Sequence, residues 1–140
     1  MLAIGLGMKA CMQGLRVRFF TLAQLAAKLR EADEADRLSA LYEDLRRADL
    51  LILDEMGCCQ LDRDSAQRIF QAVADSYECK SLIVTTDLPF SQWGKIVTDA
   101  QLATAMIDRI VHYGHLITTG NRDWRLAHSP MNKQMGMTEH

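Results

Sequence analysis

Apolar residues along this chain occur in two patterns, as short continuous runs and as stripes with helical spacing. Residues 50–53 and 81–86 form short runs, which are typical of strands buried on both faces of a parallel sheet. Residues 16–20 alternate between polar and apolar and are rich in residues that favour strands, so they predict a strand near a sheet edge. A last strand is expected over residues 115–119.

Helical stripes fill the stretches between these strands. Residues 21–24, Thr-Leu-Ala-Gln, have the pattern of a capping box, and Asp62 precedes a stripe that reaches Tyr77. Residues 30–37 are charged and fit either a turn or a continued helix. Helices are expected over residues 2–13, where small apolar residues suggest a buried helix, from residue 21, over 38–45, after 62 and over 99–113. Strands that alternate with helices in this way predict an α/β fold with a parallel sheet.

Composition and charge narrow the class of protein. The chain has 140 residues, 49% of them hydrophobic and 24% charged, with a net charge of -2, which fits one folded domain and excludes a strongly basic nucleic-acid binder. Its four cysteines form no C-x-x-C pair, and no apolar stretch approaches the roughly 18 residues of a membrane span. We therefore expect a cytoplasmic protein with reduced thiols and no membrane contact.

The strongest candidate for chemistry is the acidic end of the run at residues 50–53. Asp54 and Glu55 follow it directly, at the sheet edge where ligands bind in parallel α/β folds. This is the form of a Walker B segment, in which the first acid holds Mg²⁺ and the second polarises the attacking water. The alternative is a buried strand that ends in two solvated acids.

Four segments carry a specific resemblance. Residues 16–21, 50–57, 81–94 and 108–112 resemble the IstB-type helper ATPases of insertion sequences, which are AAA+ proteins close to the DnaC and DnaI helicase loaders. The resemblance runs from residue 2 to about 127. It implies a P-loop NTPase fold of the AAA+ RecA-like kind, a parallel sheet flanked by helices, as a partial ATP-binding domain over 1–127. Residues 128–140 are expected to be a disordered tail.

The resemblance also implies roles for individual residues. Asp54 would be the Mg²⁺-linked acid and Glu55 the general base. The strand end Thr85-Thr86-Asp87 would be the sensor 1 position beside the γ-phosphate, with Thr86 and Asp87 as its binding residues and Asp87 where the family usually has asparagine. Arg109 would be an arginine finger for a neighbouring subunit's nucleotide. The alternatives are that Asp87 is a turn residue and that the stem of Arg109 covers an apolar helix stripe.

The cofactors implied are ATP and Mg²⁺. The partners implied are DNA without sequence preference, the transposase of the same element, and further copies in an oligomer. Two other functions stay open at this point. One is helicase loading in DNA replication, and the other is a non-enzymatic remnant that modulates intact subunits.

One expected motif is absent from the sequence. No G-K-[ST] segment occurs, although the backbone amides, lysine and hydroxyl of that segment hold the phosphates and Mg²⁺ in P-loop ATPases. By resemblance, Met1 stands just after that position, so the chain is expected to lack the first strand and the P-loop and not to hydrolyse ATP alone. The missing strand lies mid-sheet in the family. Either residues 115–119 then pair with residues 81–86, or the chain is marginally stable and prone to aggregate.

Overall fold

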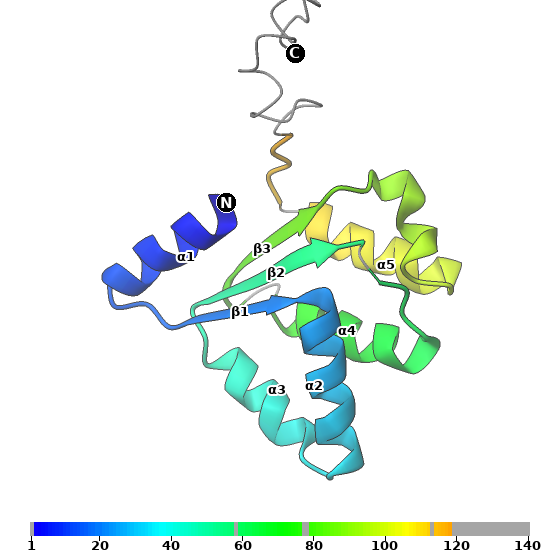
Figure 1. The fold of residues 1–140 in the computed structure, drawn as a ribbon, viewed down its shortest axis with the longest axis horizontal. Helices are drawn as coiled ribbons and strands as arrows, with labels where there is room; N and C mark the ends of the chain where they lie inside the picture. Colours follow the sequence, from blue (N-terminus) through cyan, green and yellow to red (C-terminus); the bar gives the residue numbers. More distant parts are fainter. Residues whose placement is uncertain (1, 58, 77–78, 113, 119–140) are drawn as a thin grey trace, which may run out of the picture.

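The computed structural model describes residues 2–57, 59–76, 79–112 and 114–118. The expected domain end at residue 127, the tail at 128–140 and the end of the Asp62 stripe at Tyr77 lie outside these ranges. In chain order the elements are α1 (Leu2–Met12), β1 (Val17–Thr21), α2 (Leu22–Glu34), α3 (Leu38–Arg46), β2 (Leu50–Met56), α4 (Arg63–Ser76), β3 (Ser81–Thr86), the 3-10 helix η1 (Phe90–Lys95) and α5 (Ala100–Val111). Figure 1 shows their arrangement.

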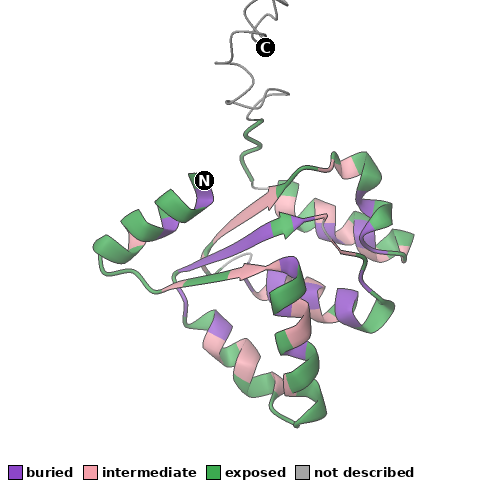
Figure 2. Ribbon diagram, in the orientation of Figure 1, coloured by how far each residue is buried: buried purple, intermediate pink, exposed green. Residues whose placement is uncertain are grey.

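The three strands form a parallel sheet in the order β1-β2-β3, so β2 lies in the centre. Its residues Leu51, Ile52 and Leu53 have no exposed surface, because helices cover both faces of this strand. Figure 2 shows β2 as the most continuously buried strand. The predictions of an α/β fold and of a doubly buried central strand are therefore confirmed.

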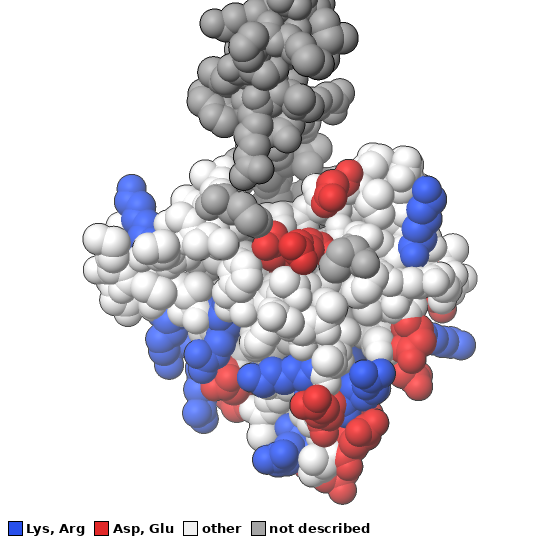
Figure 3. All heavy atoms as spheres, in the orientation of Figure 1, with Lys and Arg blue, Asp and Glu red and all other residues white. Residues whose placement is uncertain are grey.

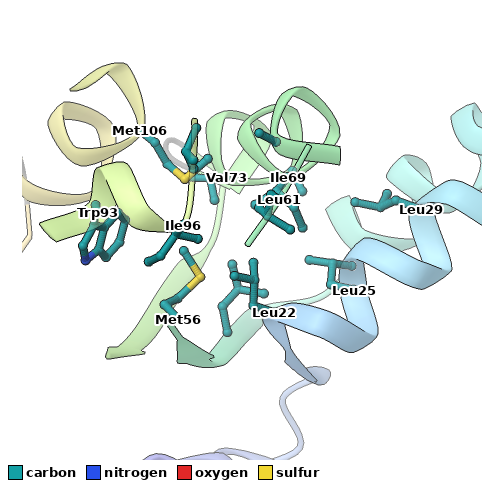
Figure 4. Close-up of a cluster of buried hydrophobic side chains, with 14 of the residues drawn as sticks. Leu22, Leu25, Leu29, Met56, Leu61, Ile69, Val73, Trp93, Ile96 and Met106 are labelled. Carbon is teal, nitrogen blue, oxygen red and sulfur yellow. The ribbon is translucent and has the colours of Figure 1, made fainter. Parts of the chain in front are cut away.

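The two faces of the sheet are covered unequally. Helices α2, α3, α4 and α5 and the turn η1 build the main hydrophobic core on one face, around Leu22, Leu25, Ile69 and Met106. Figure 4 shows this cluster, in which Met56 of β2 lies near Leu22 and Ile96. On the other face α1 is the only described helix, and it packs in a small cluster with Leu50 and Ile52 of β2. Among the described helices none is both long and apolar enough to cross a membrane.

Side-chain caps fix where the helices begin. The Thr21 hydroxyl accepts from the Gln24 N–H at 3.2 Å and the Gln24 side chain accepts from the Thr21 N–H at 3.0 Å, which is the predicted capping box. Asp62 accepts from the Ser65 N–H at 2.8 Å, as predicted. Hydrogen bonds from the side chain and backbone of Ser65 hold the pKa of Asp62 below its ordinary value. The stability that this cap contributes is therefore present above the ordinary pKa and lost as pH falls through the lowered one.

Helix α1 differs from the prediction of a buried helix. Only Ala3 and Gly7 are buried, whereas Leu2, Met8 and Met12 are 62%, 63% and 86% exposed. Ala3 and Gly7 face the sheet, and the large apolar residues face outward. A Cβ built on Gly7 would lie 2.9 Å from Cδ1 of Ile52, so this glycine permits the close approach of helix and sheet.

Strand β3 also differs from its prediction. It lies at an edge of the sheet, and its residues are partly or fully exposed rather than buried on both faces. The predicted strand over residues 115–119 is not formed in its described part, because residues 114–118 have no regular secondary structure. Of the two alternatives, pairing of this segment with residues 81–86 is therefore wrong for residues 115–118, and marginal stability stays a prediction. Hydrophobicity alone cannot tell an edge strand from a central one, which explains the error.

The packing of α1 can be tested with two glycine substitutions. We expect Gly7→Ala to be less stable than Gly5→Ala by about 1–3 kcal/mol, because the new methyl group of residue 7 would press on buried Ile52. The Gly5 position opens onto empty space, so Gly5→Ala is the matched control that isolates the helix-propensity gain of about 1 kcal/mol. Urea unfolding followed by circular dichroism measures both. Equal stabilities would contradict the close approach.

Candidate functional site

The candidate site lies where β2 and β3 end. Asp54 is buried at 4% exposure, and the next residue, Glu55, is exposed. The pairing shifts here, since Leu53 pairs with Val84 but Met56 pairs with Thr86. Two residues of β2 thus stand opposite one residue of β3, which is a β-bulge. The bulge separates the two acids, one directed into the protein and one into solvent.

The backbone of Glu55 is in the left-handed region, with φ of 57°. This conformation is uncommon for a residue with a side chain and costs roughly 1–3 kcal/mol where the surrounding structure holds it. Gly57 follows at φ 127°, and a Cβ built on it would lie 3.1 Å from Leu88. The turn after β2 is therefore bent sharply and packed against the turn after β3.

The Thr85 hydroxyl joins both acids to β3. It donates a hydrogen bond to Oδ1 of Asp54 and accepts one from the Glu55 backbone N–H at 3.1 Å. A hydroxyl group can serve both neighbours because it is a donor and an acceptor at once. Thr85 thus fixes the orientation of the Asp54 carboxylate and holds the bulge that carries Glu55.

The face on which Asp54 lies follows from the two-residue period of a strand. Leu50 and Ile52 pack against α1, so the side chain of Asp54 lies on the α1 side of the sheet. Figure 1 shows α1 running opposite to the strands, with its amino-terminal end toward their carboxyl ends. Figure 3 shows acidic side chains gathered near the carboxyl ends of the strands. The acids therefore lie at the edge where ligands bind in parallel α/β folds.

Thr86 and Asp87 lie at the same edge of the sheet. The Thr86 hydroxyl donates to the carbonyl oxygen of Met56 and accepts from the Leu88 N–H at 3.1 Å, so it stabilises the two turns. Asp87 is exposed in the bend that follows. Both predicted sensor residues thus lie at the edge of the sheet that carries the acidic pair.

Arg109 is carried by a different element. It is exposed in the last turn of α5, a helix that packs against α4 and η1. Ala103 and Met106 of the same helix are buried and Ile110 is partly buried. The predicted apolar stripe is confirmed for Leu102, Met106 and Ile110, its fourth member, Tyr113, lies outside the described residues, and Arg109 is exposed on the same helix.

The residues present fit Mg²⁺ held together with a nucleotide, and they do not fit a metal site made of protein ligands alone. No group of three or more His, Cys, Asp or Glu side chains that could hold a metal occurs in the described ranges. Mg²⁺ usually keeps several waters and binds through one or two carboxylates and the phosphates of its nucleotide. Buried Asp54, with one oxygen hydrogen-bonded to Thr85, is suited to be the carboxylate that the protein contributes to such a site.

A surface hollow lies elsewhere, over α2, α3 and α4. Within it Arg68 forms an ion pair with Asp33 at 3.2 Å, and the Tyr42 hydroxyl donates to the Arg68 carbonyl oxygen at 3.0 Å. Burial raises the pKa of Tyr42, so its hydroxyl stays protonated at neutral pH. The hollow is lined by Asp33, Tyr42, Asp64, Gln67, Arg68 and Gln71. Its polar contacts join the helices and are separate from the acidic pair.

Sequence reasoning placed Thr85 at the end of the sensor 1 strand but missed its hydrogen bonds to Asp54 and Glu55. This contact can be recognised only when the pairing of β2 with β3 is known, because the strand register and the bulge bring Thr85 to Asp54. Within β3, Thr85 lies on the Asp54 side of the sheet, whereas Thr86 points its hydroxyl at the turns. A single strand sequence does not show which of two adjacent threonines faces the acid.

Comparison with known proteins gives a consistent family match. Residues 1–132 match the sequence model of the IstB-like ATP binding protein family. The chain is 36% identical over 133 residues to the proposed ATP-binding protein of insertion sequence IS5376 from Geobacillus stearothermophilus, covering 95% of this chain and 53% of that protein. It is 38% identical over 125 residues to the corresponding IS21 protein from Pseudomonas aeruginosa, covering 89% and 47%. The chain thus spans about half the length of these relatives.

Solved structures share the fold. The AMPPCP-bound DnaA from Aquifex aeolicus superposes with a TM-score of 0.63 at 18% identity, over 72% of this chain and 32% of DnaA. The DnaC helicase loader superposes with a TM-score of 0.57 at 18% identity, over 76% of this chain and 63% of that chain. At this identity the likeness shows the AAA+ fold alone.

The hydroxyl of Thr85 can be tested by an isosteric substitution. We expect Thr85→Val to lower the free energy of unfolding by on the order of 1–3 kcal/mol, because a buried carboxylate oxygen and the Glu55 N–H would lose their partner. Thr85→Ser keeps the hydroxyl and is the matched control, with the smaller loss expected for one methyl group. Urea unfolding measures both. A Ser variant as unstable as the Val variant would show that packing, not hydrogen bonding, decides.

Proposed function

The chain belongs to the IstB-like ATP-binding protein family, and we propose that it acts as an AAA+ helper protein in DNA transposition, with ATP and Mg²⁺ as cofactors. The observation that carries this proposal is the buried Asp54 beside exposed Glu55 at the carboxyl end of the central strand. In this proposal the chain supplies the acidic half of a nucleotide site.

Asp54 and Glu55 have different tasks in the proposed site. The carboxylate of Asp54, oriented by Thr85, would hold Mg²⁺ directly or through water. When bound, Mg²⁺ would neutralise the phosphate charge that develops during phosphoryl transfer. Glu55 is exposed, so its carboxylate is accessible to a water molecule that attacks the γ-phosphate. The bulge supports this division of labour, because it directs the two acids differently.

Three further residues complete the proposal. Thr86 and Asp87 would form the sensor 1 position beside the γ-phosphate. Thr86 would contribute indirectly, because its hydroxyl stabilises the turn that carries Asp87. An ionised Asp87 only accepts hydrogen bonds, so it would contact phosphate through Mg²⁺ or water rather than directly. Arg109 would reach the nucleotide of a neighbouring copy, because α5 presents it on the surface. Self-association is thus part of the proposed function.

DNA and the transposase of the same element are the proposed macromolecular partners. The family role supports both, since the relatives are proteins of insertion sequences. On the face shown in Figure 3, basic and acidic side chains are interspersed, which favours weak contact with phosphates over sequence-specific reading. We infer a cytoplasmic location, which fits the insertion-sequence family to which the chain belongs.

A second candidate function is helicase loading in DNA replication. The observation that favours it is the shared fold with the DnaC helicase loader, at a TM-score of 0.57. Both functions would use the same nucleotide chemistry. The partner protein therefore distinguishes them.

ATP hydrolysis by this chain alone is expected to be at background. The printed sequence contains no G-K-[ST] segment, so the acidic pair has no lysine and no P-loop amides to hold the phosphates in line. Phosphate release from Mg²⁺-ATP with purified protein measures turnover, and Glu55→Gln is the control. Turnover that Glu55→Gln abolishes would contradict this expectation.

Partner capture tests the proposed function. We expect the chain, immobilised by a tag, to retain the transposase of its own element in the presence of DNA and not the replicative helicase of the host. Arg47→Ala and Arg109→Ala each remove one exposed positive charge. Weaker retention of the transposase by both variants would indicate a general charge effect, and weaker retention by Arg109→Ala alone would indicate a role of α5. Retention of the helicase alone would support the helicase-loader alternative, and retention of neither would contradict both.

A further inference from the structure

Strand β2 departs from its own two-residue period at the candidate site. Leu51 and Leu53 pack in the main hydrophobic core, so the next side chain on that face of a regular strand would be residue 55. Instead Glu55 is exposed, and Met56 lies in the main core with no exposed surface. The bulge therefore advances the strand by one residue relative to the core.

The core position that Met56 fills is unsuitable for a carboxylate. Figure 4 shows Met56 near Leu22 and Ile96, which are both buried. A regular strand would place the Glu55 side chain among these residues. Burying an unpaired charge in apolar surroundings costs far more than the strain of one left-handed residue. The bulge avoids that cost, because it places an apolar side chain in the core and leaves the carboxylate in solvent.

Hydrogen bonds from β3 stabilise the bulge but do not select which side chain enters the core. The Thr85 hydroxyl accepts from the Glu55 backbone N–H, and the Thr86 hydroxyl donates to the Met56 carbonyl oxygen. Both bonds are made to backbone groups, which glutamate and methionine have in common. The difference between the two side chains therefore selects the register.

We propose that Met56 is a positioning residue for Glu55. By filling the core position, Met56 sets the bulge, and the bulge leaves Glu55 exposed at the sheet edge that carries Asp54. Consecutive side chains of a regular strand point to opposite faces, so without the bulge Asp54 would lie on the α1 side and Glu55 in the core. The inference rests on the proposed function for the task of Glu55 and not for its location.

The proposal assigns a requirement to position 56. The residue there must be apolar and large enough to fill the space beside Leu22 and Ile96. Leucine meets both conditions, whereas serine meets neither. Position 55 has the opposite requirement, because an apolar side chain there would compete for the same space.

A variant that moves the apolar side chain from position 56 to position 55 tests the proposal. We expect the double variant Glu55→Leu, Met56→Ser to lose the left-handed conformation at residue 55 and to bury its side chain, because the strand can then pair regularly. NMR backbone chemical shifts report the conformation. Relaxation by a soluble gadolinium chelate reports the exposure of the side chain and should fall several-fold. A residue 55 that stays left-handed and exposed would overturn the proposal.

Single variants keep the test decisive if the double variant does not fold. Glu55→Leu alone has an apolar residue at both positions, so the regular pairing should be populated beside the bulge. A residue 55 that is wholly left-handed in this variant would overturn the proposal. Glu55→Gln and Met56→Leu are the matched controls, since each keeps the polarity of its position, and both should keep the bulge. Loss of the bulge in either control would also count against the role of Met56.

The position of residue 55 and the capture of partners are separate measurements, so the two proposals can fail separately. If the chain retains the transposase but residue 55 stays left-handed in the double variant, the role of Met56 alone is refuted. If residue 55 shifts into the core but the unchanged chain retains neither the transposase nor the helicase, the proposed function alone is refuted.

Discussion

The structure depends on the burial of β2 from both sides. Leu51, Ile52 and Leu53 have no exposed surface, so this strand can lie only in the centre of the sheet with helices on both faces. At its carboxyl end the same burial reaches Asp54, which is polar and must have a partner. Thr85 provides that partner across the strand pair. Strand β2 therefore contributes to both the hydrophobic core, through its apolar residues, and the acidic site, through its carboxyl end.

Local sequence signals predicted much of the fold. The capping box at Thr21, the cap at Asp62 and the helix that follows Asp99 appear as expected, because each depends on neighbours within a few residues. The exposure of α1 and the partial exposure of β3 were not predicted. Both depend on what lies across the sheet, which hydrophobic periodicity does not report.

The candidate site also contains residues that the local sequence predicts and residues that only the tertiary structure reveals. Asp54 and Glu55 were predictable, because two acids at the end of a buried apolar run are a pattern within one strand. The contribution of Thr85 was not, since it depends on a bulge and on the register of a strand that is 30 residues further along the chain. The residues that carry charge can be found by inspection of the sequence, whereas those that orient the charge require the tertiary structure.

At Glu55, the left-handed backbone conformation sets the stability of the fold against the presence of a carboxylate. Glycine would adopt φ of 57° without strain, so the residue that is best for folding is not the one present. Improving stability at this position would remove the carboxylate, and keeping the carboxylate retains the strain. Any engineered version of this protein that is optimised for thermal stability alone would therefore tend to lose its acidic pair first at Glu55.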